Sequence, residues 1–134
     1  MSLNIRVIAP DGLIWDTTTD EVVLPSLTGQ LGILQGHASL ITALEIGILR
    51  IKVNSKWKPI IVLGGFAVVK ENSVTVLISG VEEVIKTGYN EAKEFLDQSI
   101  KNLEQADTTK EKIEASQDVK RASSRVQAYQ FLQE

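Results

Sequence analysis

The sequence predicts an α+β protein in two parts: an all-β sandwich or flattened barrel over residues 1–86, then an antiparallel two-helix hairpin over residues 87–134. The spacing of apolar residues changes near Gly88 from every second residue to every third or fourth. The composition changes at the same place. The first part holds both tryptophans, all three prolines and eight of the nine glycines, whereas the second part is dense in charged residues.

The first part is a series of short apolar segments separated by turn residues. Apolar and polar residues alternate over 3–7, and turn residues at 9–12 precede the next apolar segment. A continuous apolar run at 60–63 predicts a strand that is buried on both faces, which the glycines at 64–65 should break or bulge. Short strands at such regular spacing favour a sandwich or a flattened barrel.

A glycine-rich stretch over residues 24–44 stands out in the first part. It alternates apolar residues with Gly29, Gly32 and Gly36, which can adopt positive φ where a Cβ would clash. It also contains His37, the only histidine of the sequence. Three readings of His37 are open: a satisfied turn or core residue, an interface residue, or a catalyst or ligand.

The second part predicts two amphipathic helices with unequal apolar stripes. Asn90 is a candidate N-cap of the first helix, and Thr108 with Glu111 has capping-box spacing for the second. The first stripe is Ala92, Phe95, Leu96, Ser99, Ile100, Leu103 and Ala106, and the second is Ala115, Val119, Ala122, Val126 and Tyr129. Because the second stripe is mostly alanine and valine, the hairpin should be marginal alone and depend on the surface it lies on.

Lys120, Arg121 and Arg125 form a basic group on the second predicted helix. Arg121 and Arg125 fall on one face, beside the apolar stripe. This group is either a solvated face or a strip that meets an acidic partner surface. Ile113 and Phe131 lie off the apolar stripe, which favours a second docking state of the hairpin.

The composition excludes several classes of function. A net charge of −3 and a pI near 5.2 argue against nucleic acid binding. Without cysteine, and with a single histidine, the chain has neither cysteine-based zinc sites nor multi-histidine metal sites. The start of the sequence does not have the pattern of a signal peptide, and the sequence holds no apolar run long enough to span a membrane.

No catalytic or cofactor-binding motif is present either. A Ser-His-Asp set with His37 has no supporting motif, and the spacing Gly29-x-x-Gly32 lacks the lysine of a phosphate-binding loop. Glu82-Glu83 is read as a solvated strand end, because neighbours on an extended chain point to opposite faces. We therefore expect no catalytic residue, no metal and no cofactor.

The glycine-rich stretch resembles the hallmark segment of the epsilon subunit of F-type ATP synthase. The residues that carry the resemblance are Leu24-Pro25, Gly29-Gln30-Leu31-Gly32-Ile33-Leu34, Gly36-His37-Ala38, Leu40 and Thr42-Ala43-Leu44. Residues 7–16 and 64–69 are similar to the family as well, so that the match covers nearly the whole chain. The opening Val7-Ile8-Ala9-Pro10 and the segment 121–126 look closest to cyanobacterial and plastid members.

The resemblance implies a non-catalytic subunit of the central stalk, which couples proton flow through the c-ring to ATP synthesis. The β-domain would lie against the gamma subunit and the c-ring, through positions that Gly29, Gln30, Leu31, Gly32 and His37 match. The complex would be peripheral on an energy-transducing membrane, at the stromal face of the thylakoid or the cytoplasmic face of a bacterial inner membrane.

For the hairpin, the resemblance implies two positions. It would lie folded against the β-domain, or extend along gamma toward the alpha and beta subunits and restrain ATP hydrolysis. Lys120, Arg121 and Arg125 would then pair with acidic residues of a beta subunit.

Two alternatives stay open. Some bacterial members of the family bind ATP through an Asp-x-x-Arg-Ala motif at the start of the first helix, but residues 84–92 lack both the aspartate and the arginine. We therefore expect no ATP binding at micromolar concentrations, which argues against an ATP-sensing variant. The other alternative, a free-standing β-sandwich that binds a small ligand, would show no affinity for gamma.

Overall fold

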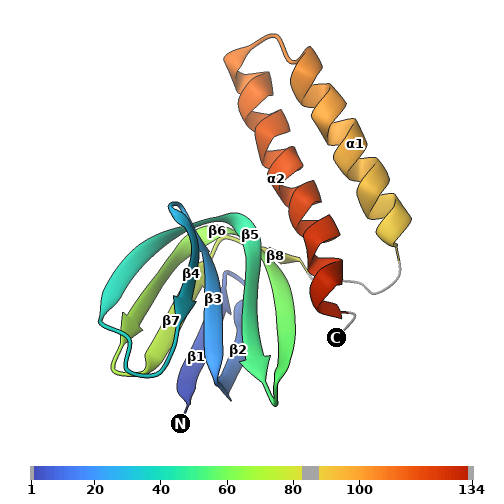
Figure 1. Ribbon diagram of the computed structural model, residues 1–134. Helices are drawn as coiled ribbons and strands as arrows, with labels where there is room; N and C mark the ends of the chain where they lie inside the picture. Colours follow the sequence, from blue (N-terminus) through green and yellow to red (C-terminus); the bar gives the residue numbers. More distant parts are fainter. Residues whose placement is uncertain (1, 83–87, 133–134) are drawn as a thin grey trace.

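The computed structural model describes residues 2–82 and 88–132, in which eight strands precede two helices (Figure 1). The strands are β1 (Leu3–Ala9), β2 (Gly12–Thr19), β3 (Glu21–Ser26), β4 (Gly29–Ile33), β5 (Leu40–Val53), β6 (Lys56–Lys70), β7 (Ser73–Ile78) and β8 (Val81–Glu82). The helices are α1 (Tyr89–Gln105) and α2 (Thr109–Leu132). The predicted fold class is confirmed, and the predicted boundary between residues 86 and 87 lies outside the described residues.

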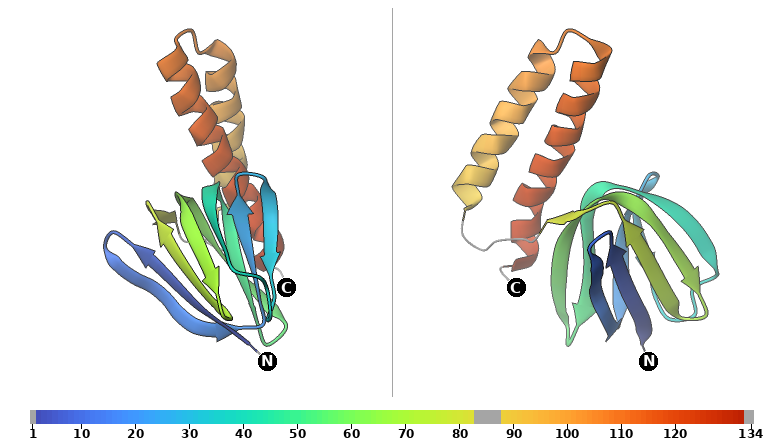
Figure 2. Two further views of the ribbon diagram at one scale, coloured as in Figure 1. Left: turned by 90° about the vertical axis from the view of Figure 1, so that its left-hand side faces the viewer. Right: turned by 180° about the vertical axis from the view of Figure 1, so that it is seen from behind.

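The strands form one sheet that bends over to make the sandwich (Figure 2). Their order is β2-β1-β7-β6-β5-β3-β4, and β8 pairs with β6 beside this path. The ladder between β1 and β7 is parallel and the others are antiparallel. No ladder joins β2 to β4 within the described residues, so the sheet is open and the flattened-barrel alternative is not adopted.

Large aliphatic side chains fill the space between the layers. The fully buried ones among them are Leu3, Ile5, Val7, Val22, Leu24, Ile33, Leu49, Val62, Val74 and Val76. They alternate with exposed residues along β1, as the period of two predicts. This core accounts for the stability of the β part through burial of apolar surface.

The glycines at 64–65 do not break β6, which continues from Lys56 to Lys70. They change its alternation instead. Before them the residues of the core are Ile60 and Val62, and after them Ala67 and Val69. The side of β6 that faces the core therefore changes by one residue at the glycines. In this way β6 contributes core residues on both sides of the bend in the sheet.

Backbone conformation requires glycine at a few of these positions. At Gly65, φ is 142°, and a Cβ would lie 2.1 Å from the carbonyl oxygen of Leu77. In the 24–44 stretch, Gly29 and Gly36 have φ of 121° and 85°, as anticipated. Gly32 does not adopt positive φ, because it lies inside the regular ladder between β3 and β4.

The two helix starts have different caps. Gly88, in a left-handed conformation with φ 106°, is the N-cap of α1 and makes no side-chain cap hydrogen bond. The prediction of Asn90 as the cap is wrong, since Asn90 already lies in the first turn of α1. At α2 the Thr108 cap is confirmed, because the backbone N of Glu111 donates to Thr108 Oγ1 at 3.1 Å. The carboxylate of Glu111 accepts from the backbone N of Asp107 at 3.1 Å, one residue before the N-cap, rather than from Thr108 itself.

The helices form an antiparallel hairpin in which α2 lies between α1 and the sandwich (Figures 1 and 2). Their buried residues are all small: Ala92, Ser99, Ala115, Ala122, Ser124 and Ala128. Ile100, which belongs to the predicted stripe, is exposed. Among the described residues, neither helix is sufficiently long and apolar to span a bilayer.

Candidate interaction surfaces

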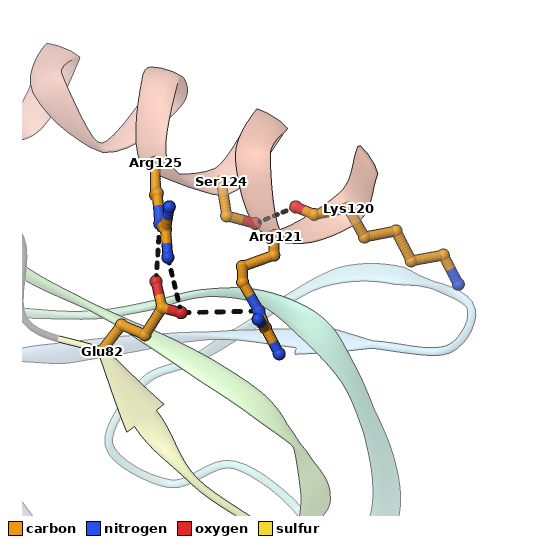
Figure 3. Close-up of polar contacts among 5 residues, drawn as sticks. All are labelled: Glu82, Lys120, Arg121, Ser124 and Arg125. Atoms are coloured by element: carbon orange, nitrogen blue, oxygen red, sulfur yellow. Dashed lines mark hydrogen bonds and ion pairs between the residues drawn. The ribbon is translucent and has the colours of Figure 1, made fainter. Parts of the chain in front are cut away.

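The carboxylate of Glu82, on β8, contacts two arginines of α2. Arg125 donates from Nε to Glu82 Oε2 at 2.8 Å and from Nη2 to Oε1 at 2.9 Å, and Arg121 Nε lies 3.4 Å from Oε1 (Figure 3). The Glu82 side chain is only 22% exposed. The reading of Glu82 as a solvated strand end is therefore wrong, because its pairing with Ile61 places it beneath α2. Glu83 lies outside the described residues.

Arg125 connects three elements. Besides its two bonds to Glu82, its guanidinium lies 4.8 Å from the ring centroid of Phe95 on α1. The hydrogen bonds to Glu82 raise the pKa of Arg125 above its ordinary value, despite partial burial. One side chain therefore joins α1, α2 and β8.

The third residue of the basic group makes a weaker contact. Lys120 Nζ lies 3.4 Å from Glu45 Oε1 on β5, and both side chains are well exposed. All three members of the predicted basic group thus pair with carboxylates of the sandwich. In this conformation the basic face pairs within the chain.

A second contact holds the end of α2, and the sequence alone did not reveal it. The Arg50 guanidinium lies between two rings, 4.7 Å from the centroid of Trp57 and 4.4 Å from that of Phe131. Arg50 Nε is buried without a hydrogen-bond partner, so the stack is its main interaction. The only available signal was that Phe131 lies off the apolar stripe of its helix.

The outer face of the β5–β6 ribbon is divided in two by the glycines at 64–65. On the side toward Trp57, Ile61 pairs with Ile48 and is 1% exposed although it is not part of the sandwich core. The helix α2, which docks on this side through Arg50 and Glu82, covers it. Within the apolar run at 60–63, Ile60, Ile61 and Val62 are therefore buried on both faces of β6, as predicted, and Leu63 is partly buried.

The other half of the ribbon has an uncovered apolar face. Ala43, Phe66, Leu77 and Ile8 face one another across β5, β6, β7 and β1, and Phe66 is 46% exposed. Ile41, two residues before Ala43 on the same face of β5, is 76% exposed. It borders a shallow depression lined by Ser39, Leu40, Ile41, Val68, Val69 and Lys70. The sequence carries a signal for this face. Phe66–Val69 is apolar at every position, whereas a strand with one face in the core needs apolar residues only at every second position.

The residues predicted to meet partners lie along β4 and in the loop that follows it. Gly29, Gln30, Leu31 and Gly32 are in β4, whose only ladder among the described residues is with β3. His37 follows in the loop after β4, so it does not form one compact site with Gly29. Gly29, Gln30 and Gly32 are exposed, and Leu31 packs partly against the core.

His37 is a half-buried turn residue. Its backbone N donates to the carbonyl of Leu34 at 3.1 Å, and its Nδ1 lies 2.7 Å from the carbonyl oxygen of Ala38. The neighbouring Gly36 N donates to Asn72 Oδ1 at 2.7 Å, which ties this loop to the β6–β7 turn. These contacts support the turn reading of His37 and place its loop next to the apolar depression.

An open β-sandwich that carries a docked helical hairpin and an uncovered apolar face defines a protein-binding module. The family model described as "ATP synthase, Delta/Epsilon chain, beta-sandwich domain" matches residues 2–84. The chain is 70% identical over 132 residues to the chloroplastic ATP synthase epsilon chain of Pylaiella littoralis, covering 98% of this chain and all of the relative. It is 52% identical to that of Gracilaria tenuistipitata var. liui, with 98% of each chain covered.

The chain therefore belongs to the ATP synthase epsilon-chain family, whose members are non-catalytic subunits. Solved structures agree in fold. A chain of the Euglena gracilis mitochondrial ATP synthase matches with a TM-score of 0.81 at 17% identity, covering 95% of this chain and 80% of that one. A chain of the Tetrahymena thermophila mitochondrial ATP synthase central stalk and c-ring matches with a TM-score of 0.66 at 16% identity, covering 96% and 97%.

Proposed function

We propose that this chain is the central-stalk subunit of a chloroplast-type ATP synthase, coupling proton flow through the c-ring to ATP synthesis at the stromal face of the thylakoid membrane. The observation that carries the proposal is the 70% identity to a chloroplastic epsilon chain over the whole of that relative. The complex supplies the catalysis, and this chain supplies contacts within the rotor.

The uncovered half of the ribbon is the surface we assign to the gamma subunit. Ile41 and Phe66 on this face are large, apolar and exposed, and contiguous exposed apolar residues mark protein–protein contact sites. The exposed positions of the β4 edge, Gly29, Gln30 and Gly32, with Leu31 and the nearby His37 loop, are assigned to the c-ring and its junction with gamma. An edge strand held by one neighbour leaves backbone groups free for a partner.

The hairpin is assigned a regulatory role. Helices of 17 and 24 residues extend about 25 and 36 Å at 1.5 Å per residue, which is long enough to reach from the β-domain toward the alpha and beta subunits. The small residues between the helices provide little packing energy, so the hairpin depends on the surface beneath it. In the extended position Lys120, Arg121 and Arg125 would pair with acidic residues of a beta subunit and restrain ATP hydrolysis.

Ending the chain after Gly88 tests this role. We expect the assembled complex to hydrolyse ATP faster, because the restraint is removed, and to keep its assembly and proton coupling, because the β-domain is intact. The measurements are ATPase activity and proton pumping of reconstituted complexes with the full and the shortened chain. Failure to assemble, or unchanged hydrolysis, would show that the hairpin is structural.

A further inference from the structure

Glu82 is the carboxylate that both arginines of α2 approach, and Arg125 is the one that hydrogen-bonds to it. Arg125 uses Nε and Nη2 on the two oxygens of Glu82, and Arg121 Nε approaches the same carboxylate. A guanidinium that binds one carboxylate through two parallel bonds cannot bind a second one in the same way with the same nitrogens. For Arg125, pairing with Glu82 and pairing with a partner's carboxylate through these two nitrogens are therefore mutually exclusive, whereas Arg121 Nε makes an ion pair without a hydrogen bond.

The contact is exchangeable as well as specific. The side chains of Arg121 and Arg125 are 36% and 38% exposed as wholes, although Arg121 Nε itself is buried. Pairs of this exposure are modest in strength and respond to salt. The arginine pairs therefore contribute a modest, salt-sensitive share of docking, beside the stack of Arg50 on Phe131.

Glu82 differs from the other acidic contact of α2. Glu45 meets Lys120 through one exposed contact of 3.4 Å, whereas Glu82 makes two bonds of 2.8 and 2.9 Å. Two parallel bonds fix orientation and are stronger than a single long contact. Glu45 is therefore a matched acidic control that lies under the same helix.

We propose that Glu82 is a built-in competitor for the arginine face of α2: it imitates the acidic surface that Arg121 and Arg125 meet in the extended state, and so sets how much of the hairpin is free to restrain hydrolysis. This inference rests on the proposed regulatory function of the hairpin. The arginines serve both states, but Glu82 serves only the docked one. Removing Glu82 and removing the arginines must therefore change hydrolysis in opposite directions.

The position of the hairpin can be measured directly in the full chain. The sequence has no cysteine, so spin labels on Lys56→Cys and Gln117→Cys, both exposed, report the distance between β6 and α2 by pulsed electron resonance. We expect Glu82→Gln to lower the ratio of docked to undocked molecules roughly five- to tenfold, and Glu45→Gln to change it less than about twofold. An unchanged docked population in Glu82→Gln would overturn the proposal.

The second measurement is ATP hydrolysis by the assembled complex. We expect Glu82→Gln to lower hydrolysis below that of the unmodified complex, and Arg121→Gln with Arg125→Gln to raise it. A change of the same sign in both variants, or no change in Glu82→Gln, would contradict competition. Glu82→Gln could undock the hairpin while the chain ended after Gly88 leaves hydrolysis unchanged. That result would confirm the docking contact but refute both the regulatory function and the competition.

Discussion

The sandwich and the hairpin are held together by different means. The sandwich buries leucine, isoleucine and valine side chains drawn from strands on both layers. In the described part of the hairpin the fully buried side chains are alanine and serine, and larger ones such as Phe95 and Leu96 are partly buried. Burial of a large aliphatic side chain contributes about 1.5–3 kcal/mol, and an alanine methyl contributes much less. The sandwich therefore has a stable core of its own, while the hairpin is positioned by a few specific contacts with Glu82, Glu45 and Arg50.

The largest effect should come from the sandwich core. Leu49 is completely buried, so Leu49→Ala should lower the free energy of unfolding by about 2–5 kcal/mol through lost burial and the cavity left behind. Urea denaturation followed by tryptophan fluorescence measures this. The control is Leu13→Ala at an exposed site on β2, which should change stability by less than about 0.5 kcal/mol. A loss below about 1 kcal/mol for Leu49→Ala would show that the sandwich is as loosely packed as the hairpin.

An intermediate effect should follow from enlarging a buried alanine. Ala122 of α2 is fully buried, so Ala122→Leu should overpack the hairpin and cost about 1–3 kcal/mol. Hydrogen exchange should become faster in α1 and α2 but not in the strands, because the two parts have separate cores. Gln117→Leu, at an exposed position of α2, is the control. Faster exchange throughout the sandwich would mean that the two parts unfold as one unit.

The smallest effect on stability should come from the uncovered face of the ribbon. Phe66→Glu should change the free energy of unfolding by less than about 0.5 kcal/mol, because the side chain is half exposed and outside the core. The same change should abolish binding to isolated gamma subunit, measured by pull-down or calorimetry, by placing a charge in the apolar contact. Retained binding to gamma would show that the face has another use.

Local patterns predicted the two parts of the chain well. The periods of two and of three to four, and the Thr108 cap that bonds to Glu111, depend on neighbours in the sequence. Whether the cap of α1 is Gly88 or Asn90 is a choice between nearby residues that the periodicity does not determine. The glycines at 64–65 were expected to break or bulge β6, and their role in shifting its inward side emerges only from the ladders on both sides.

The site depends on contacts between distant segments. Glu82 contacts Arg125 because β8 pairs with β6 and α2 crosses above them. Arg50, on β5, contacts Phe131 because the end of α2 also lies over this sheet. The spacing of residues along the sequence does not predict these contacts. The basic group and the glycine-rich stretch could be singled out in advance, but their partner residues within the chain could not.

We expect the parallel ladder between β1 and β7 to delay completion of the sandwich during folding. Asn4 lies opposite Ser73, and Ile8 lies opposite Leu77, so the first strand finds this neighbour only after most of the sandwich sequence exists. Closing so long a loop is slow compared with forming the helices, whose contacts are local. During synthesis the early strands must wait for β7, and the surface on which α2 docks becomes complete only when β8 joins β6. The hairpin, which emerges last, then meets a finished surface.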